Sequence, residues 1–384
     1  MKILITGGAG FIGTEIVRQL HNSTDNCITV LDSMTQQIHG EDWQDSYLFQ
    51  SIKDKCHFIK GDIRNLSDIS DALDENEVIV HLVAETGTGQ SMYEINKYNE
   101  VNIMGTSNLL QAISNRGKKS RIRKIILASS RSIYGEGRYE CPHCGVIYPA
   151  HRERKRLDAG DFGFYCSTCG SRLKILATTE DSEINPQSLY AYTKYAQEMM
   201  LKTMCPAFGI DYTIFRFQNV YGAGQSLKNP YTGILSVFST LMLKNKAVNI
   251  FEDGKESRDF IHVKDIAKGV IAALDCAETD GEVINLGSRV NTSVMEIANL
   301  LKKYYGSESD LKITGDFRIG DIGHNRADIS KAKRLIDFVP DISLEEGLKD
   351  FCKWVLSQEC DNSGYEQSLC EMEKAGMLIR NRKG

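Results

Sequence analysis

The chain opens with the stretch KILITGGAGFIG, residues 2–13, in which a short aliphatic run leads directly into a glycine-rich loop. Gly7, Gly10 and Gly13 stand where such a loop turns and enters a helix. Glycines there allow backbone N–H groups to approach a pyrophosphate closely, and the helix N-terminus adds the positive end of its dipole. The stretch predicts a strand, a dinucleotide-binding turn and a helix, in that order.

Asp32 ends the next predicted strand and follows Gly13 by 19 residues. A carboxylate at that distance binds the 2′-OH of the adenosine ribose and repels a 2′-phosphate, so NAD is favoured over NADP. Asp62 fits either an adenine contact or a turn. Further cofactor contacts are expected after the first, third and fourth strands, from Phe11, Ile12, Asp62, Ile63, Leu82 and Ala84.

Short apolar runs alternate with helical patterns through the first half of the chain. Predicted strands cover residues 2–6, 27–31, 56–59, 77–82 and 122–129, and predicted helices cover 11–20, 66–73 and 91–113. Strands that are apolar on both faces are typical of parallel sheets. The pattern predicts an α/β fold with a doubly wound parallel sheet of the Rossmann type.

A helix at 188–205 and a strand at 212–217 continue this pattern, which then loosens into helices at 234–243, 263–274, 293–303 and 344–355. We expect a smaller α/β substrate domain there. The predicted domains are an NAD-binding Rossmann domain at 1–136 and 179–220, an insertion at 137–178, a mainly substrate-binding domain at 221–357 and a C-terminal helical tail at 358–384. In that tail, residues 364–382 predict either a packed helix or a frayed end.

The composition is that of an ordinary folded protein, with 384 residues, 41 % hydrophobic, 25 % charged and a net charge of −5. It excludes collagen-like and disordered chains and gives no long-range attraction to nucleic acid or an anionic membrane. The apolar runs fall far below the roughly 20 residues that span a bilayer, and none resembles a signal peptide. We therefore expect a cytoplasmic protein.

Four of the eleven cysteines form two Cys-x-x-Cys-Gly knuckles separated by 21 residues: Cys141, Cys144, Cys166 and Cys169. This spacing is typical of a Cys₄ zinc ribbon, and four thiolates leave no open position for a catalytic water. The pattern predicts a structural Zn²⁺. The other seven cysteines, Cys360 among them, are single and fit packing positions. Between the knuckles lies the basic stretch 151–156, which we expect near substrate phosphates, at a partner surface or on a solvated face.

Tyr190 and Lys194 lie four residues apart on the predicted helix 188–205 and therefore share one of its faces. A neighbouring ammonium lowers the pKa of a phenol, which can then act as a general base for a hydroxyl. Ser130 ends the predicted strand 122–129, and open α/β sheets bind ligands at such strand ends. These three residues are the candidate catalytic set.

The glycine turn, Asp32, Ser130, Tyr190 and Lys194 together resemble the extended short-chain dehydrogenase/reductase family, whose members act on nucleotide sugars. The resemblance covers about residues 1–357 apart from the insertion. It implies that Ser130 hydrogen-bonds the reacting oxygen beside Tyr190, with Ser132 as a possible substitute. It also implies a homodimer formed through the predicted helices at 91–113 and 188–205.

The same resemblance suggests substrate contacts. The segments 216–222, 257–263 and 318–321 are similar to family segments that bind the substrate diphosphate, here through Asn219, Arg258 and Arg318. The loop after the fourth strand adds candidates for cofactor or sugar contacts, or forms an ordinary glycine-rich loop: Glu85, Thr86, Thr88 and Gln90.

The residues after Ser130 limit which of the family's reactions this chain can catalyse. The dehydratases of the family carry carboxyl groups where this chain has Arg131 and Ser132, so a dehydratase would lack its proton carriers here. A 4-epimerase needs only Tyr190, the nicotinamide and space for a ketone to turn over. A 4-keto reductase or a dehydratase of the family stays open as an alternative.

Segments 85–94 and 224–233 and the cysteine insertion are similar to the branch of dTDP-L-rhamnose 4-epimerases, which interconvert dTDP-L-rhamnose and dTDP-6-deoxy-L-talose. Another NDP-sugar epimerase is the alternative within the class. The alternative from another class is an NAD-sensing, nucleic-acid-binding protein that uses the zinc ribbon. We expect a nucleotide-sugar substrate and neither a nucleic-acid nor a membrane partner.

Overall fold

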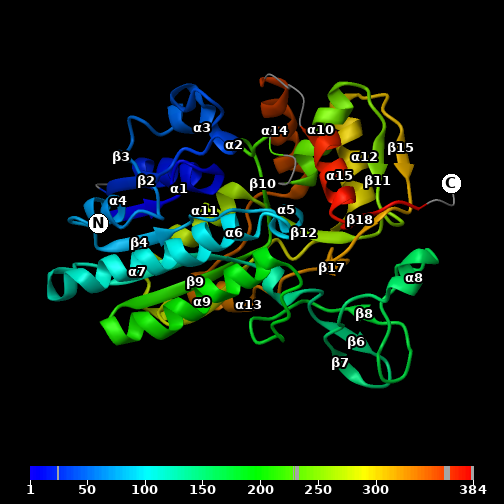
Figure 1. Ribbon diagram of the computed structural model, residues 1–384, viewed down its shortest axis with the longest axis horizontal. Coiled ribbons are helices and arrows are strands. Elements are labelled where there is room, and N and C mark those ends of the chain that lie inside the picture. The colour runs from blue at the N-terminus through cyan, green and yellow to red at the C-terminus, as the bar shows by residue number, and fades with distance from the viewer. Residues whose placement is uncertain (24–25, 228, 230–232, 359–363, 382–384) are drawn as a thin grey trace.

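A computed structural model describes residues 1–23, 26–227, 229, 233–358 and 364–381. Lys228, residues 230–232, Cys360 and Arg382, which belong to patterns noted above, lie outside the described residues. A large sheet with its helices occupies one side of the molecule, and smaller sheets and helices occupy the other (Figure 1). No helix in the described ranges is long and apolar enough to cross a membrane.

The large sheet has seven parallel strands in the order β13-β9-β5-β4-β1-β2-β3. The order reverses between β1 and β4, where doubly wound sheets bind their ligands. The predicted Rossmann sheet is confirmed. Its strands are β1 (Lys2–Thr6), β2 (Cys27–Asp32), β3 (His57–Lys60), β4 (Val78–His81), β5 (Lys124–Ser130), β9 (Asp211–Phe217) and β13 (Glu282–Leu286).

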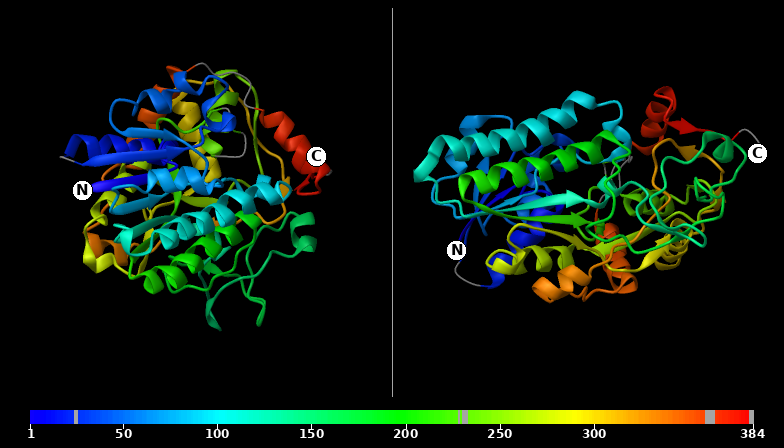
Figure 2. Two further views of the ribbon diagram at one scale, coloured as in Figure 1. Left: turned by 60° about the vertical axis from the view of Figure 1, so that its left-hand side comes forward. Right: turned by 90° about the horizontal axis from the view of Figure 1, so that it is seen from below.

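Alternate residues of each strand enter separate cores on the two faces of this sheet. Ile3 and Ile5 pack with α1 (Phe11–Ser23), α11 (Val263–Ala272) and α13 (Ser330–Ile336). Leu4 packs on the opposite face, with helices α4 (Leu66–Ala72), α7 (Gly105–Arg116) and α9 (Leu189–Phe208). Figure 2 shows α7 and α9 side by side on that face.

The predicted helix 91–113 differs at its start. A separate turn, α5 (Thr88–Ser91), precedes α6 (Ile95–Tyr98), a π-helical stretch η2 (Asn99–Met104) and α7. Ser91 is buried, and its hydroxyl donates to the Thr88 carbonyl, so it closes the short turn instead of opening the long helix. The remaining short helices of this half are α2 (Gln36–His39), η1 (Trp43–Asp45), α3 (Tyr47–Gln50), η3 (Gly117–Lys119) and η4 (Arg131–Tyr134).

The second half builds a separate core from α10 (Ile234–Leu243), α12 (Val294–Tyr305), α14 (Leu344–Leu356) and α15 (Tyr365–Lys374). However, β13 is a strand of the large sheet and α11 packs on that sheet, although both fall within the range 221–357. The predicted domain boundary at residue 220 therefore does not separate the large sheet from the smaller ones. The strands of this half are β10 (Asn219–Tyr221), β11 (Val248–Ile250), β12 (Ser257–His262), β14 (Asn291–Ser293), β15 (Leu311–Ile313), β16 (Phe317–Arg318), β17 (His324–Asn325) and β18 (Leu378–Ile379), and one short helix, η5 (Ala277–Thr279), precedes β13.

The C-terminal tail corrects one prediction. A single helix over 364–382 is wrong beyond Lys374, because Gly376 adopts a positive φ of 71° and ends the helix. The chain then forms β18, which pairs antiparallel with β16 and buries Leu378. The tail therefore supports the strand that carries Arg318.

The cysteine insertion forms a small three-stranded sheet in the order β7-β6-β8, and we call residues 137–178 the ribbon. Its core contains Tyr139, Phe164 and Leu173 together with two of the cysteines. Its elements are β6 (Tyr139–Cys141), β7 (Gly145–Ile147), β8 (Lys174–Ile175) and α8 (Arg154–Asp158).

The glycine turn gives a first prediction. A Cβ at Gly13 would lie 2.5 Å from the Gly8 Cα, whereas a Cβ at Gly10 would meet only the Gly7 carbonyl at 3.2 Å. We expect Gly13→Ala to lower the free energy of unfolding by about 1–3 kcal/mol, because two backbone segments would have to separate. Gly10→Ala, the matched control, should cost less. Equal losses in urea titrations of the two variants would contradict this account.

Candidate active site

A cavity of about 720 Å³ lies at the carboxyl ends of the parallel strands and extends to the smaller sheets. Of the predicted site residues outside the ribbon, Lys194 and Gln90 are not among those that line it. The predicted residues that line the cavity are Gly7, Gly10, Phe11, Ile12, Gly13, Asp32, Asp62, Ile63, Leu82, Ala84, Glu85, Thr86, Thr88, Ser130, Ser132, Tyr190, Asn219, Arg258 and Arg318.

The glycine turn has the shape that a dinucleotide needs. Gly7 has a φ of 73°, and a Cβ there would lie 2.9 Å from the backbone N of Val83, so the ends of β1 and β4 come unusually close. Asp32 at the end of β2 accepts hydrogen bonds from the N–H groups of Ala9 (3.1 Å) and Met34 (3.0 Å). The fixed carboxylate and the glycine cradle fit the adenosine ribose and pyrophosphate of NAD.

Asp62 is a turn residue at the edge of the cavity, and its contact with adenine stays a prediction. Its Oδ1 accepts from the backbone N of Arg64 at 2.8 Å, which makes it a turn residue, and it also lines the cavity. Hydrogen bonds from the Arg64 guanidinium lower the pKa of the Asp62 carboxyl and keep it charged. Ile63 beside it is buried and packs on Gly105.

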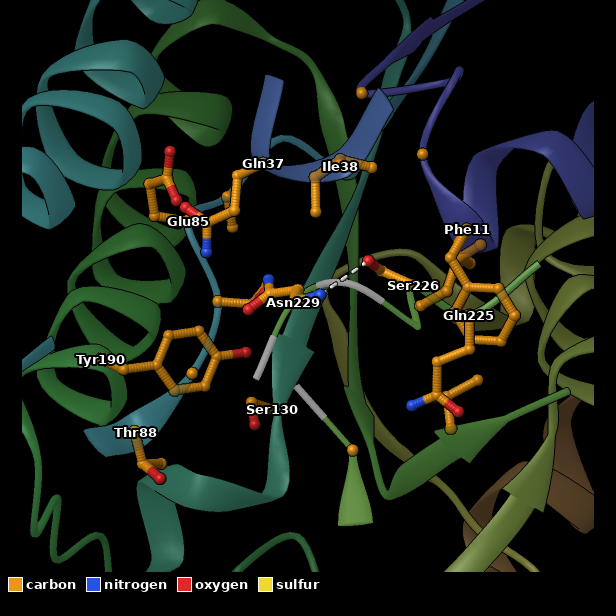
Figure 3. A pocket seen from close by; sticks show the side chains of 18 of the residues that line it. Phe11, Gln37, Ile38, Glu85, Thr88, Ser130, Tyr190, Gln225, Ser226 and Asn229 are labelled. Carbon is orange, nitrogen blue, oxygen red and sulfur yellow. Dashed lines mark hydrogen bonds between the residues drawn. The ribbon is translucent and has the colours of Figure 1, made fainter. Parts of the chain in front are cut away.

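Tyr190 lies in the first turn of α9, and its backbone N–H donates to Ser91 Oγ at 3.1 Å. Its phenol points into the cavity near Ser130 (Figure 3). Burial raises the pKa of Tyr190, while a hydrogen bond with Ser130 and the charge of Arg131 lower it. The Ser132 hydroxyl donates to Ser130 Oγ at 2.9 Å and so orients Ser130, while its use as a substitute stays a prediction.

Lys194 lies on α9 with Tyr190, and its catalytic role stays a prediction. Its Nζ is buried and donates to the Ala128 carbonyl at 2.8 Å. Burial lowers the pKa of Lys194 to about 7. Burial of Tyr190 opposes the charge of Arg131, which is the cation that lowers the pKa of Tyr190 in this structure.

Arg131 is the residue that the sequence analysis missed, since it was considered only as the absence of a carboxyl group. Its Nε donates to Asn219 Oδ1 at 2.7 Å, and within the described chain its buried Nη1 has no hydrogen-bond partner. Burial and the charge of Arg258 lower the pKa of Arg131 to about 9. Its position directly after Ser130, at the end of β5, was the available signal.

Two further arginines approach the same cavity from the smaller sheets. Arg258 on β12 pairs with Asp321 at 3.3 Å and donates to the Gly323 carbonyl at 2.8 Å. Arg318 on β16 lies over the Phe251 ring at 4.8 Å, and its buried Nε has no partner among the described residues. Planar guanidinium groups with free donors suit the oxygens of a diphosphate.

The loop after β4 is fixed by hydrogen bonds to the side chains of Asn102 and Tyr98. The Asn102 side chain bonds both backbone groups of Glu85, and the Tyr98 hydroxyl donates to the Thr86 carbonyl at 2.5 Å. Thr88 also lines the cavity, whereas Gln90 is directed to Tyr98 outside the lining. The loop is fixed in shape, and its contacts to cofactor or sugar stay a prediction.

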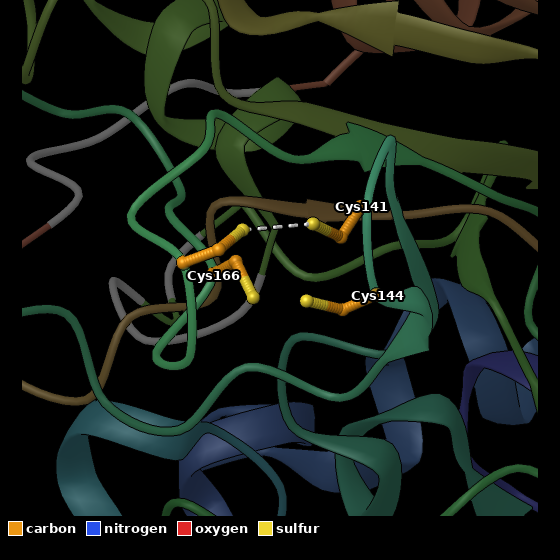
Figure 4. A group of neighbouring side chains, drawn as sticks. Cys141, Cys144 and Cys166 are labelled. Atoms are coloured by element: carbon orange, nitrogen blue, oxygen red, sulfur yellow. Dashed lines mark hydrogen bonds between the residues drawn. The ribbon is translucent and has the colours of Figure 1, made fainter.

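The four ribbon cysteines meet as their spacing predicts. Their Sγ atoms all lie within 4.8 Å of one another (Figure 4). Gly145 and Gly170 follow the second cysteine of each knuckle with φ values of 77° and 72°, a conformation that turns the chain back toward the thiols. The thiol-only donor set fits Zn²⁺.

The basic stretch 151–156 does not line the cavity. Arg154 pairs with Asp158 at 2.8 Å, and Arg156 pairs with Asp161 at 3.1 Å. The hypothesis that this stretch reaches substrate phosphates directly is therefore wrong for the observed structure, because its arginines are paired with acidic residues.

Comparison with known proteins places this site in a family. The sequence model described as the NAD dependent epimerase/dehydratase family matches residues 3–148 and 164–287. The chain belongs to this family. The predicted family and α/β fold are thereby confirmed, and so is the prediction of an enzyme of this NAD-dependent class.

Individual members of the epimerase/dehydratase family match over nearly the whole chain. A dTDP-L-rhamnose 4-epimerase from Burkholderia thailandensis is 34 % identical over 94 % of this chain and 96 % of its own length. The crystal structure of UDP-glucuronic acid 4-epimerase from Bacillus cereus, in complex with UDP-glucuronic acid and NAD, is 28 % identical, covers 93 % of this chain and 99 % of its own, and has a TM-score of 0.76. A UDP-glucose 4-epimerase from Thermotoga maritima is 27 % identical with the same coverage and a TM-score of 0.75.

The lowered pKa of Lys194 gives a pH-dependent prediction. The unfolded lysine titrates at its ordinary value of 10.5 and the folded one at about 7. Between these values the unfolded chain holds a proton that the folded chain lacks, so this group makes stability rise with pH and imposes its full cost below about pH 7. We expect the melting temperature of Lys194→Met, relative to wild type, to fall from about pH 7 to about pH 10.

Lys174→Met, which removes an exposed lysine from the ribbon strand β8, is the control for the loss of one positive charge. A difference between Lys194→Met and wild type that stays constant with pH would contradict the assignment of a neutral, buried amine.

Proposed function

We propose that this protein is an NAD-dependent nucleotide-sugar 4-epimerase acting on dTDP-L-rhamnose to give dTDP-6-deoxy-L-talose. The observation that carries the proposal is one cavity in which Tyr190 and Ser130 lie with the guanidinium groups of Arg258 and Arg318. The first pair suits a reacting hydroxyl and the second a diphosphate. The similarity to the Burkholderia enzyme supports this substrate.

Each step uses residues already placed. The Tyr190 phenolate removes the proton of the C4 hydroxyl, and Ser130 donates a hydrogen bond to the same oxygen. NAD held at the glycine turn would accept the C4 hydride and would later return it to the opposite face of C4. The 4-keto sugar turns over between these two events, and Tyr190 then returns its proton to the C4 oxygen. The redox change cancels over one turnover, so tight cofactor retention is expected.

The cationic end of the cavity positions the substrate. Asn219, oriented by Arg131, and the two arginines of the smaller sheets hold the diphosphate, so the sugar extends toward Tyr190. A strand end without a carboxyl group beside Ser130 supports epimerisation over dehydration. The second candidate is 4-epimerisation of a UDP-sugar, favoured by the UDP-sugar complexes of the structural relatives.

We also propose a homodimer formed through α9 and the η2–α7 helix. Large apolar side chains remain exposed on these elements: Met104 (55 %), Tyr192 (55 %) and Met199 (42 %). For the alternative of a nucleic-acid-binding ribbon, the pairing of Arg154 and Arg156 with acidic neighbours is unfavourable, because it neutralises the charges that would bind phosphates.

The activity is tested by proton NMR of dTDP-L-rhamnose incubated with the protein as purified, with no cofactor added. We expect an equilibrium mixture inverted at C4. Tyr190→Phe should lower the rate by about 10²–10⁴-fold, because the general base is lost. UDP-glucose and UDP-glucuronate form parallel arms. Inversion of a UDP-sugar alone would select the second candidate, and no inversion of any of the three would overturn the proposal.

We further propose that Cys141, Cys144, Cys166 and Cys169 bind one structural Zn²⁺. The observed cluster of four Sγ atoms supports this, since a closed thiolate shell contributes folding energy and no reaction site. In the reducing cytoplasm, a metal also accounts for four close thiols better than disulfides do.

Metal analysis should find about one zinc per chain, and Cys144→Ser should lose it together with several degrees of melting temperature, because the ribbon core is small. Cys27→Ser, which removes an exposed single cysteine, is the matched control and should keep the metal. Full zinc content in Cys144→Ser, or none in wild type purified without chelator, would count against the site.

A further inference from the structure

The ribbon contacts the segment 321–328 at both of its own ends. Where the chain enters the ribbon, Glu136 accepts a hydrogen bond from the Gly323 N–H at 2.8 Å. Where the chain leaves it, the Thr178 N–H donates to the Arg326 carbonyl at 2.8 Å. The same segment follows Arg318 and contains Asp321, the partner of Arg258.

Between these ends, the core of the ribbon packs against the segment 321–328. The Phe164 ring lies 5.7 Å from the His324 ring, centre to centre, and a Cβ at Gly323 would come within 2.6 Å of Phe164. Phe164 is 5 % exposed, so this contact is part of the ribbon core and not a loose surface contact.

Arg152 makes a buried, charged contact between the ribbon and this part of the chain. Its guanidinium forms a two-pronged pair with Glu252, with Nη2 at 2.7 Å from Oε1, and Nη2 also donates to the Asp321 carbonyl at 3.3 Å. The two paired side chains are only 7 % and 4 % exposed. A planar fork on a buried carboxylate fixes both partners in orientation as well as distance.

These two partners are linked to the groups that contact Arg318 and Arg258. Glu252 directly follows Phe251, whose ring supports Arg318 at 4.8 Å. Asp321 holds Arg258 at 3.3 Å. Arg152 therefore ties the ribbon to the supports of both cavity arginines, although it does not line the cavity itself.

We propose that Arg152 is a positioning residue through which the ribbon fixes Arg258 and Arg318 for the nucleoside diphosphate of the substrate. The inference rests on the proposed function, which assigns these two arginines to a diphosphate. A segment that is ordered before binding loses less conformational freedom on binding, so the ribbon contributes to affinity. Tyr190 and Ser130 lie on the large-sheet side and have no contact with Arg152, so the chemical step does not depend on it.

The test measures binding of dTDP and of UDP to the full-length protein by calorimetry, together with KM, kcat and melting temperature. We expect Arg152→Met to raise Kd and KM by roughly ten- to a hundredfold with kcat little changed, because small displacements of binding groups have effects of this size. Arg156→Met, in the same basic stretch but paired within the ribbon, is the matched control and should bind like wild type.

A double variant distinguishes a positioning role of Arg152 from the cost of leaving the Glu252 carboxylate buried without a partner. Arg152→Met leaves the Glu252 carboxylate buried and unpaired, and adding Glu252→Gln removes that charge. If Arg152 positions the segment, Kd stays raised in the double variant even where the melting temperature recovers. Recovery of Kd in the double variant would overturn the inference, because Arg152 would then only neutralise Glu252.

Arg152→Lys is a milder second variant, which keeps the test possible if Arg152→Met does not fold. Lysine keeps the charge but cannot bridge Glu252 and the Asp321 carbonyl as a planar fork, so an intermediate Kd is expected. Wild-type Kd in both Arg152 variants would overturn the inference alone. Absence of dTDP and UDP binding by the wild-type protein would instead overturn the proposed function, and the inference with it.

Discussion

The common direction of the seven strands is the constraint on which the rest of the molecule depends. Because all seven run parallel, their carboxyl ends meet at one edge, where Thr6 lies opposite both Leu31 and His81. The residues that follow these strands are therefore brought together although they are far apart in sequence. A reversed strand would carry its terminal side chain to the opposite edge, away from the cavity. The glycine turn, Asp32 and Ser130 share one cavity for this reason.

Features encoded within about 20 residues could be predicted from the sequence. The glycine turn, the Tyr190–Lys194 spacing and the cysteine knuckles each carry their own local signal. Features that depend on distant partners could not. The strand β18 exists because residues 378–379 pair with 317–318, and the lowered pKa of Lys194 follows from burial that no local pattern reports. The side-chain pair of Arg152 and Glu252 spans 100 residues and has no local signal at all.

The charges of the cavity are arranged for an anion. Arg131, Arg258 and Arg318 all line it, and Asp321 faces them as a carboxylate whose pKa is lowered by Arg258, Arg318 and other arginines against the opposing effect of burial. Several cations held together away from water repel one another, which is why Arg258 lowers the pKa of Arg131. A diphosphate would supply the missing negative charge, so binding and the relief of this repulsion go together. The free donors of Arg131 and Arg318 have the same explanation.

The place of the ribbon in the chain explains how it can be present without disturbing the reacting groups. It is inserted between Ser130 and Tyr190, yet it begins and ends on the neighbouring antiparallel strands β6 and β8, where Tyr139 pairs with Ile175. Its two ends are therefore close together. An insertion whose ends meet in this way does not displace the flanking elements β5 and α9. A core this small cannot hold a fold alone, so the ribbon needs cross-links or a neighbour to pack on. The neighbour is the segment 321–328, which contacts the ribbon through Arg152 and the chain entering the ribbon through Glu136, and which also contains Asp321, the partner of Arg258.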